Sequence, residues 1–120
     1  MISARNAFRK SDRLLTSADF RHVFQRARKR SAGGLTLYVR GNDLGYSRLG
    51  IAISRKCSPR AVVRNRIKRV IRESFRLRKP KLGAVDLVFL GQPGMARSRL
   101  PELRGAVDKL LIEIEQCATP

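Results

Sequence analysis

The sequence predicts a small α+β protein in which helices pack against a sheet. Three observations predict this fold class: two segments alternate apolar and polar residues with a period of two, a third is continuously apolar over the length of a strand, and the other apolar residues recur at helical spacing. The predicted order is helix, strand, strand, helix, strand, helix, arranged as a two-layer sandwich. Because 120 residues is close to the commonest domain size, residues 1–120 are expected to form one domain.

Basic residues without periodicity open the chain, so residues 1–12 are predicted to form a flexible arm. An amphipathic helix is then predicted over Ser17–Arg28, where apolar residues fall at positions i, i+3, i+4 and i+7: Phe20, Val23, Phe24 and Ala27. The basic segment that follows is interpreted as the tail of this helix, ended by Gly33 and Gly34.

Leu35–Arg40 and Ser47–Ser54 both alternate with a period of two, and the turn-forming letters GNDLGY separate them. This arrangement predicts an antiparallel hairpin. One face of the hairpin would carry the aliphatic residues Leu35, Leu37, Val39, Leu49, Ile51 and Ile53. The other face would carry Tyr38 beside Gly50 and Ala52, which leaves space over the sheet for a ligand.

A second helix is predicted over Pro59–Leu77, with Ser58 as its candidate N-cap and the letters KPKLG as its end. Ala84–Leu90 is predicted to be a strand in the middle of the sheet, because its residues are mostly apolar on both faces. Pro101 begins the last predicted helix, whose apolar stripe consists of Leu103, Val107, Leu110, Leu111 and Ile114.

The charge of the chain is extreme and unevenly distributed. The 27 basic and nine acidic residues give a formal net charge of +18, and residues 1–82 hold 23 of the basic residues but only four of the acidic ones. A field of this sign attracts polyphosphates. No apolar run approaches the roughly 20 residues of a membrane-spanning helix, and no export signal is recognised. Nucleic acid is therefore the expected partner, no membrane is expected, and the expected location is cytoplasmic.

The second predicted helix has two different faces. On a helical wheel, one arc holds the residues expected to be buried: Val63, Ile67, Val70, Ile71, Ser74 and Leu77. The opposite arc holds Asn65, Lys68, Arg69, Arg72 and Arg76, with Arg64 and Arg66 on its two borders. Like charges at this spacing repel by a few tenths of a kcal/mol per pair, and Glu73 is the one acidic residue in the helix. The positive face therefore indicates an external polyanion rather than a merely solvated surface.

The aromatic residues allow two interpretations. Phe20 and Phe24, four residues apart beside a valine, are on their own typical of a core. Tyr38 differs, because strand alternation places it among small residues on the face away from the aliphatic side chains. A trough of aromatic side chains bordered by arginines is typical of proteins that hold single strands, in which each stacked base contributes about 1 to 3 kcal/mol.

The chain offers no recognisable catalytic set. Its early carboxylates are scattered, its one histidine, His22, has no evident partner, and no G-x-x-x-x-G-K-[ST] loop is present. Cys57 and Cys117 are too few for a zinc site and are interpreted as two free thiols rather than a disulfide. The chemical groups of any catalysis are therefore expected to come from elsewhere.

Three stretches of the sequence match a known family. RLLTSADFRHVF, LGIAISRKCSPRAVV and RNRIKRVIRESFR together resemble the protein subunit of bacterial ribonuclease P, over a region from Arg13 through the final helix. The resemblance implies a ribosomal-protein-like α/β sandwich with a left-handed crossover between parallel strands around the basic helix. It also implies a subunit of an endoribonuclease that removes the 5′ leader of precursor tRNA, with the hydrolysis carried out by a catalytic RNA and magnesium ions bound mainly by that RNA and the substrate. No catalytic residue, metal ligand or obligate protein partner is then expected in this chain.

The resemblance further implies roles for particular residues. The first helix and one face of the sheet would form a cleft for the single-stranded leader, which carries over to Phe20, Phe24, Tyr38, Ser54, Arg55 and Lys56. The basic helix would contact the catalytic RNA through Arg64, Asn65, Arg66, Lys68, Arg69 and Arg72, with Arg76 on the same face.

Two other interpretations stay open on the residues alone. A structural RNA-binding protein such as a ribosomal component needs only the positive charge, and a self-sufficient nuclease predicts cleavage by the pure protein in magnesium. The arginine-asparagine-arginine helix and the aromatic face favour the ribonuclease P subunit over both.

Overall fold

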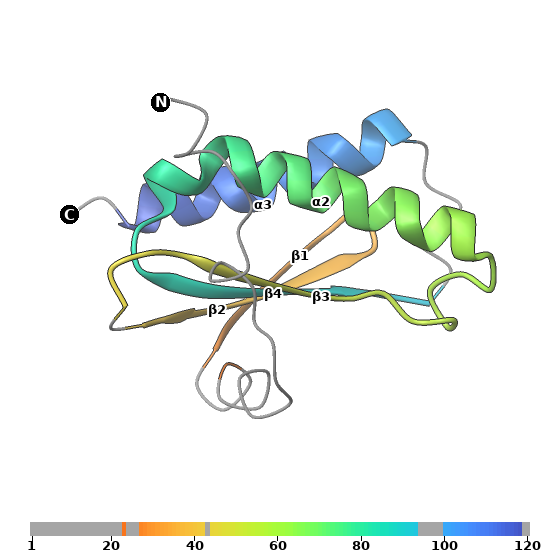
Figure 1. Cartoon of the computed structure of the whole chain (residues 1–120), viewed down its shortest axis with the longest axis horizontal. Helices are drawn as coiled ribbons and strands as arrows, with labels where there is room; N and C mark the ends of the chain where they lie inside the picture. Colours follow the sequence, from red (N-terminus) through yellow and green to blue (C-terminus); the bar gives the residue numbers. More distant parts are fainter. Residues whose placement is uncertain (1–22, 24–26, 43, 94–99, 119–120) are drawn as a thin grey trace.

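The computed structural model describes residues 23, 27–42, 44–93 and 100–118. Its elements follow the order β1 (Arg28–Ala32), β2 (Leu35–Gly41), β3 (Arg48–Ala52), α2 (Ala61–Leu82), β4 (Val85–Gly91) and α3 (Leu100–Ala118). Figure 1 shows two layers, with α2 and α3 packed against each other on one face of a four-stranded sheet. The predicted α+β sandwich is confirmed. Neither described helix is both long enough and apolar enough to span a membrane.

The strand order in the sheet is β1-β2-β4-β3. β4 pairs antiparallel with β2 and parallel with β3, so it separates the two segments that were predicted to form a hairpin. That hairpin prediction was wrong. The physical reason is that β4 is apolar on both faces and is buried best in the middle of the sheet, while the loop after β2 needs only to cross about two strand spacings, roughly 10 Å.

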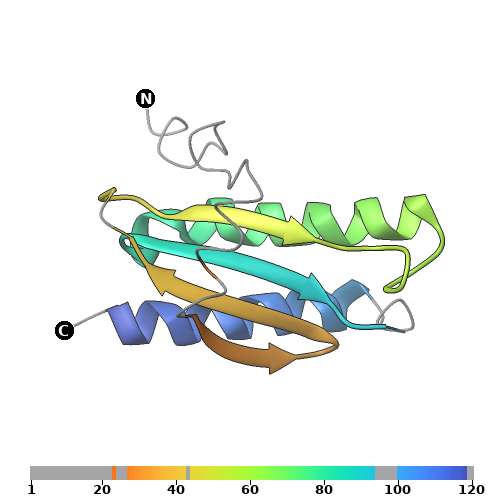
Figure 2. The same ribbon diagram turned by 90° about the horizontal axis from the view of Figure 1, so that it is seen from below.

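The parallel pair β3 and β4 is connected through α2, and Figure 2 shows its handedness. The sheet faces the viewer there, both strands point the same way, and α2 lies behind them. Seen from the helix side with the strands pointing upward, β4 lies to the left of β3. The crossover is therefore left-handed, as the family resemblance implied and against the usual preference for right-handed connections.

The basic segment before the two glycines is a strand and not a helical tail. β1 pairs antiparallel with β2 from Arg28 opposite Val39 to Ala32 opposite Leu35. Gly33 and Gly34 form the two-residue turn between them, with φ angles of 57° and 82°. Two-residue hairpin turns of this type need positive φ at both positions, which is why glycines stand there. The predicted helix that was extended to Arg28 therefore ends before that residue, and most of its length lies outside the described residues.

The two faces of the sheet carry the residues that strand alternation predicted. Leu35, Leu37, Leu49, Leu87 and Phe89 lie on the helix-covered face and are at most 2% exposed. The predicted α3 stripe is confirmed, because all of its members are buried in the same core: Leu103, Val107, Leu110, Leu111 and Ile114. Val23, which is helical, packs with Val88 on the opposite face of the sheet, which we call the open face.

Helix α2 differs from its prediction at both ends. It begins at Ala61 after Arg60, whose side chain makes no capping bond, while the Ser58 hydroxyl accepts a hydrogen bond from the Arg60 N–H at 3.3 Å. It continues through Pro80 to Leu82. The buried residues of α2 are Ile67, Val70, Ile71, Ser74, Phe75 and Leu82, so Phe75 and Leu82 are added to the predicted stripe. Leu77, predicted to be buried, is 57% exposed.

We expect Gly33→Ala to lower the free energy of unfolding by about 2 kcal/mol, because an L side chain is strained at positive φ. A Cβ at this position would also lie 2.7 Å from the Cβ of Ala106 in α3. Gly41→Ala is the matched control, since it ends β2 with ordinary φ and nothing within 4 Å of an added Cβ. Urea unfolding of both variants measures the difference, and equal midpoints would contradict this account of the turn.

Candidate functional site

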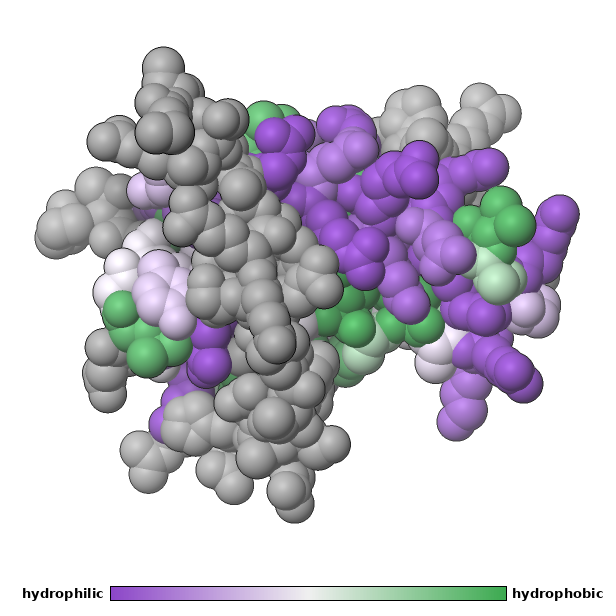
Figure 3. All heavy atoms as spheres, in the orientation of Figure 1, coloured by the Kyte–Doolittle hydropathy of each residue, from purple (hydrophilic) through white to green (hydrophobic). Residues whose placement is uncertain are grey.

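The outer face of α2 carries the cations that the wheel predicted. Asn65, Arg66, Arg69, Arg72 and Arg76 are exposed, and Lys68 is partly exposed. None of these six side chains makes a hydrogen bond or an ion pair with another described residue. Figure 3 shows hydrophilic side chains gathered over α2 on this side of the molecule. We call Asn65, Lys68, Arg69, Arg72 and Arg76 the basic stripe.

Five carboxylates of the described residues are already paired with arginines outside the basic stripe. Each ion pair joins two different elements of the fold, and the pairs are Arg30–Glu113, Arg48–Asp86, Arg78–Asp108, Arg78–Glu115 and Arg104–Glu73. Glu73 is the acidic residue of α2 itself, and it turns to Arg104 of α3 at 2.8 Å rather than toward the stripe. The folded protein therefore neutralises the arginines between its elements and leaves the basic stripe without counter-charges among these residues.

The two border arginines have different surroundings. The Nη1 of Arg64 donates a hydrogen bond to the Ser58 carbonyl at 2.9 Å, so this side chain is tied to the turn that precedes the helix. Arg66, on the other border, is exposed. The structure thus separates the two, and Arg66 is the one free to contact another molecule in this arrangement.

On the open face, Tyr38 is partly buried against the Val23 and Val88 pair. The Nζ of Lys29, on the neighbouring strand β1, lies 6.0 Å from the centre of the tyrosine ring, within the range of a cation–π contact. Val88, which is next to Tyr38 on β4, is fully buried and packs with Val23, so any space over the open face does not extend over Val88. Phe20 and Phe24, the other predicted aromatic residues of the cleft, lie outside the described residues.

Ser54, Arg55 and Lys56 are exposed in the turn after β3. The Ser54 carbonyl accepts hydrogen bonds from the backbone N–H groups of Cys57 at 3.0 Å and Ser58 at 3.4 Å, which fixes this turn. Tyr38 is level with Gly50 of β3, two strand spacings or roughly 10 Å across the sheet, and Ser54, Arg55 and Lys56 lie four to six residues farther along the chain, beyond the end of β3. Of the predicted cleft residues, the structure therefore describes Tyr38 on the open face and Ser54, Arg55 and Lys56 in the turn beyond β3, and it does not bring Tyr38 and this turn together.

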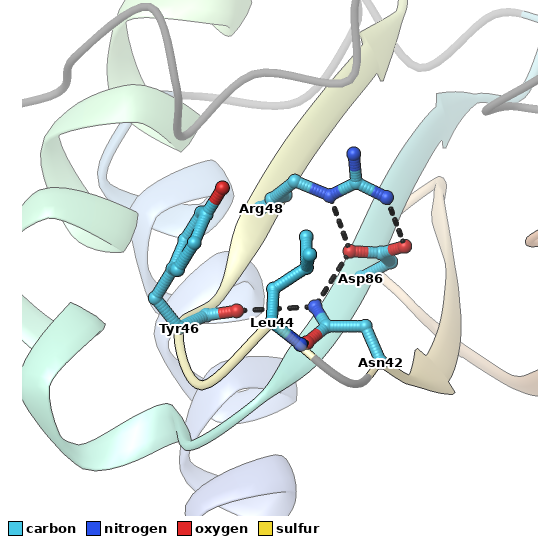
Figure 4. A network of polar contacts seen from close by, with 5 residues as sticks. All are labelled: Asn42, Leu44, Tyr46, Arg48 and Asp86. Atoms are coloured by element: carbon cyan, nitrogen blue, oxygen red, sulfur yellow. Dashed lines mark hydrogen bonds and ion pairs between the residues drawn. The ribbon is translucent and has the colours of Figure 1, made fainter.

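A buried carboxylate organises the loop between β2 and β3, as Figure 4 shows. Asp86 of β4 is 1% exposed and accepts two hydrogen bonds from Arg48, one from Nε at 2.9 Å and one from Nη2 at 2.7 Å. Asn42 donates from Nδ2 to Asp86 at 2.8 Å and to the Tyr46 carbonyl at 3.0 Å, while its Oδ1 accepts from the Leu44 N–H at 2.9 Å. A carboxylate that accepts two hydrogen bonds from one guanidinium is held strongly in position.

Sequence reasoning missed two features of these surfaces. Lys29 was assigned to a helical tail, although a Gly-Gly pair before an alternating segment is itself a hairpin indicator that would have placed it on a strand. The structural role of Asp86 was not predicted, because its pairing with Arg48 depends on the order of the strands. Within the described residues, no three His, Cys, Asp or Glu side chains gather where they could hold a metal ion.

The fold and its surfaces define a class: a small α+β protein with a left-handed crossover helix that presents uncompensated cations on its outer face. Comparison with known proteins gives the particular family. Residues 8–115 match the family model described as Ribonuclease P, and the chain belongs to this family of ribonuclease P protein components. A relative named ribonuclease P protein component from Legionella pneumophila is 40% identical over 92% of this chain and 96% of its own length. One with the same name from Thioalkalivibrio sulfidiphilus is also 40% identical, over 94% and 95%.

Solved structures agree with this assignment. The Staphylococcus aureus RNase P protein superposes with a TM-score of 0.78 and 26% identity over 88% of this chain and 95% of that one. The Thermotoga maritima protein superposes with a TM-score of 0.72 and 29% identity over 84% and 96%. The family and the fold predicted from the sequence are therefore both confirmed.

Cys57 is a free thiol buried just before α2. Burial raises its pKa above the ordinary value of 9.0, although the charge of Arg64 acts in the opposite direction. The thiol therefore stays protonated, and unreactive, to higher pH in the folded protein than in the unfolded chain. Because the unfolded thiol ionises first, its contribution to stability is present below about pH 9 and is lost as the pH rises through the folded pKa.

In a Cys117→Ser background, we expect Cys57 to react with a thiol reagent much more slowly in the folded protein than in urea at the same pH. The time course of reagent release measures both rates. In the Cys57→Ala variant of the same background, the part of the alkaline stability loss that is due to this thiol should disappear. Equal labelling rates in the folded and unfolded protein would show that the thiol is accessible.

Proposed function

We propose that this protein is the RNA-binding subunit of ribonuclease P, a tRNA-processing enzyme. In this proposal it holds the catalytic RNA with the outer face of α2 and the single-stranded 5′ leader of precursor tRNA with the open face of the sheet. The RNA carries out the magnesium-dependent hydrolysis that gives the mature tRNA 5′ end. The observation that carries the proposal is the basic stripe, which has no counter-charges among the described residues, while Arg30, Arg48, Arg78 and Arg104 are each paired with a carboxylate.

Three physical arguments support the α2 face as the RNA contact. Cations of one sign at three- and four-residue spacing destabilise an isolated helix slightly, so an external polyanion stabilises the arrangement. Arginine predominates over lysine in the stripe, and its planar guanidinium suits phosphate oxygens and stacking on bases. The stripe is held rigidly, because Ile67, Val70 and Ile71 on the opposite side of α2 are buried in the core. A rigid row of exposed cations suits the fixed phosphates of a folded RNA.

The open face supports a single strand for a different reason. Tyr38 offers part of its ring and Lys29 brings a cation over it, which together provide stacking and charge for one nucleotide. Arg55 and Lys56 are exposed in the turn after β3 and supply further positive charge along the path of the RNA leader. Magnesium is assigned mainly to the RNA and the substrate, and the role of this chain is to bind and position both. The proposed location is the cytoplasm, where tRNA is processed.

Reconstitution with a bacterial ribonuclease P RNA and a precursor tRNA tests the proposal as a whole. We expect the protein to lower the magnesium concentration needed for leader release, and the protein alone to cleave nothing. An RNA-binding protein of another kind would bind the RNA without changing this requirement.

Arg69→Ala is expected to weaken binding to the ribonuclease P RNA by about tenfold, because it removes a charged contact to phosphate. The slope of log affinity against log salt should fall by about one, since one fewer counterion is released. Arg104→Ala is the matched control: it removes the same charge from an exposed arginine that already pairs with Glu73, and it should leave affinity and slope nearly unchanged. Filter binding at several salt concentrations measures both, and equal effects of the two variants would contradict the assignment of the stripe.

Tyr38→Ala is expected to weaken binding of leader-bearing precursor tRNA to the holoenzyme by roughly 5- to 100-fold, through loss of base stacking. Binding of mature tRNA and of the catalytic RNA should stay unchanged. Tyr38→Phe keeps the ring and should bind the leader normally. Because Tyr38 packs against Val23 and Val88, thermal unfolding of each variant must show an intact fold. Equal losses for precursor and mature tRNA would place the leader elsewhere.

A further inference from the structure

We propose that a pocket beyond the basic stripe, at the C-terminal end of α2, holds one unstacked base of the ribonuclease P RNA. This inference rests on the proposed function for its partner, but it concerns residues with no role in that proposal. The pocket has a volume of about 250 Å³ and is lined by Gly45, Tyr46, Ser47, Lys79, Pro80 and Gly83. Its walls therefore come from the loop between β2 and β3 on one side and the last turn of α2 on the other.

The loop wall is fixed in place before any ligand binds. Asn42 holds the Tyr46 carbonyl and the Leu44 N–H, and it is itself bonded to the buried carboxylate of Asp86. Figure 4 shows the Tyr46 ring directed away from this network. A preformed wall loses little conformational entropy on binding, which favours recognition of a small rigid ligand.

The lining suits a planar heterocycle. The ring of Tyr46, 38% exposed, offers a stacking surface, while glycine, serine and proline leave space and Lys79 is the one residue besides Tyr46 that brings a long side chain to the lining. The volume is below the roughly 300–1,000 Å³ of pockets for drug-sized ligands, so the fitting ligand is smaller. Ser47, 1% exposed, has a hydroxyl with no hydrogen-bond partner among the described residues, and a base edge could supply one after a small shift of that side chain.

Charge connects the pocket to the stripe. Lys79 follows Arg72 by seven residues and Arg76 by three, so on a helix it continues the same face. Seven residues of α-helix correspond to about 10 Å along the axis. An RNA backbone that follows the stripe toward the C-terminal end of α2 would therefore reach the pocket, and a base turned out of its stack could enter it.

The test compares Tyr46→Ala with Leu44→Ala in binding to the full-length ribonuclease P RNA. Leu44 is a matched control: it is 47% exposed in the same loop and does not line the pocket. The network is preserved in both variants, because it uses the backbone groups of these residues and not their side chains. We expect Tyr46→Ala to weaken binding roughly 5- to 100-fold with an unchanged salt slope, Tyr46→Phe to bind normally, and Leu44→Ala to have no effect.

A spectroscopic arm reports stacking directly, because the chain contains no tryptophan. The fluorescence of a Tyr46→Trp variant should be quenched when the RNA is added, and that of Leu44→Trp should change little.

Equal affinities for Tyr46→Ala and Leu44→Ala, or a salt slope that falls by one as for a phosphate contact, would overturn the base pocket. Quenching by precursor tRNA but not by the ribonuclease P RNA would overturn the choice of RNA. If Arg69→Ala weakens RNA binding as expected and Tyr46→Ala leaves it unchanged, the pocket alone is refuted. If the unmodified protein does not bind the ribonuclease P RNA, the proposed function is refuted.

Discussion

The burial of β4 on both faces is the constraint on which the rest of the structure depends. Leu87, Val88 and Phe89 are all fully buried, so this strand must lie inside the sheet with a neighbour on each side. Its parallel pairing with β3 requires a connection that returns across the sheet, and α2 is that connection. The helix therefore spans the sheet with its apolar stripe pressed against the core. Its other face is left outward for its whole length, and this is where the basic residues stand.

The few carboxylates of the chain decide which arginines remain available. Those with ion pairs join β1 to α3, β3 to β4 and α2 to α3, so the scarce negative charge serves to connect elements. Exposed pairs of this kind add little stability individually. Together they divide these arginines into two groups. Arg30, Arg48, Arg78 and Arg104 form ion pairs within the fold, while Arg69 and Arg72 are exposed and form none with the described residues. The buried Arg48–Asp86 pair does more than connect, since it also sets the shape of the loop that precedes β3.

Local patterns in the sequence predicted the elements and faces well, because strand alternation and helical spacing depend only on near neighbours. The basic stripe was predicted in this way, and so were the strand residues Leu37 and Leu49 that face the core. The strand order could not be predicted from these patterns, since the alternation of β2 and β3 is equally compatible with a hairpin and with an inserted strand. The left-handed crossover came from family resemblance and not from physics, which favours the opposite hand. The Tyr46 pocket could not be predicted from local patterns either, because its two walls lie more than 30 residues apart in the chain.

An uncompensated row of cations gives the protein and its complex opposite responses to salt. In the free protein, Lys68, Arg69, Arg72 and Arg76 repel one another, so added ions screen that repulsion and raise the stability of the fold. In the complex, the same ions compete with the protein for the phosphates and lower its affinity. The ionic strength that best preserves the isolated subunit is therefore higher than the one that best supports assembly. A bound RNA takes over the screening that salt gives the free protein, and so acts as part of the folding environment of α2.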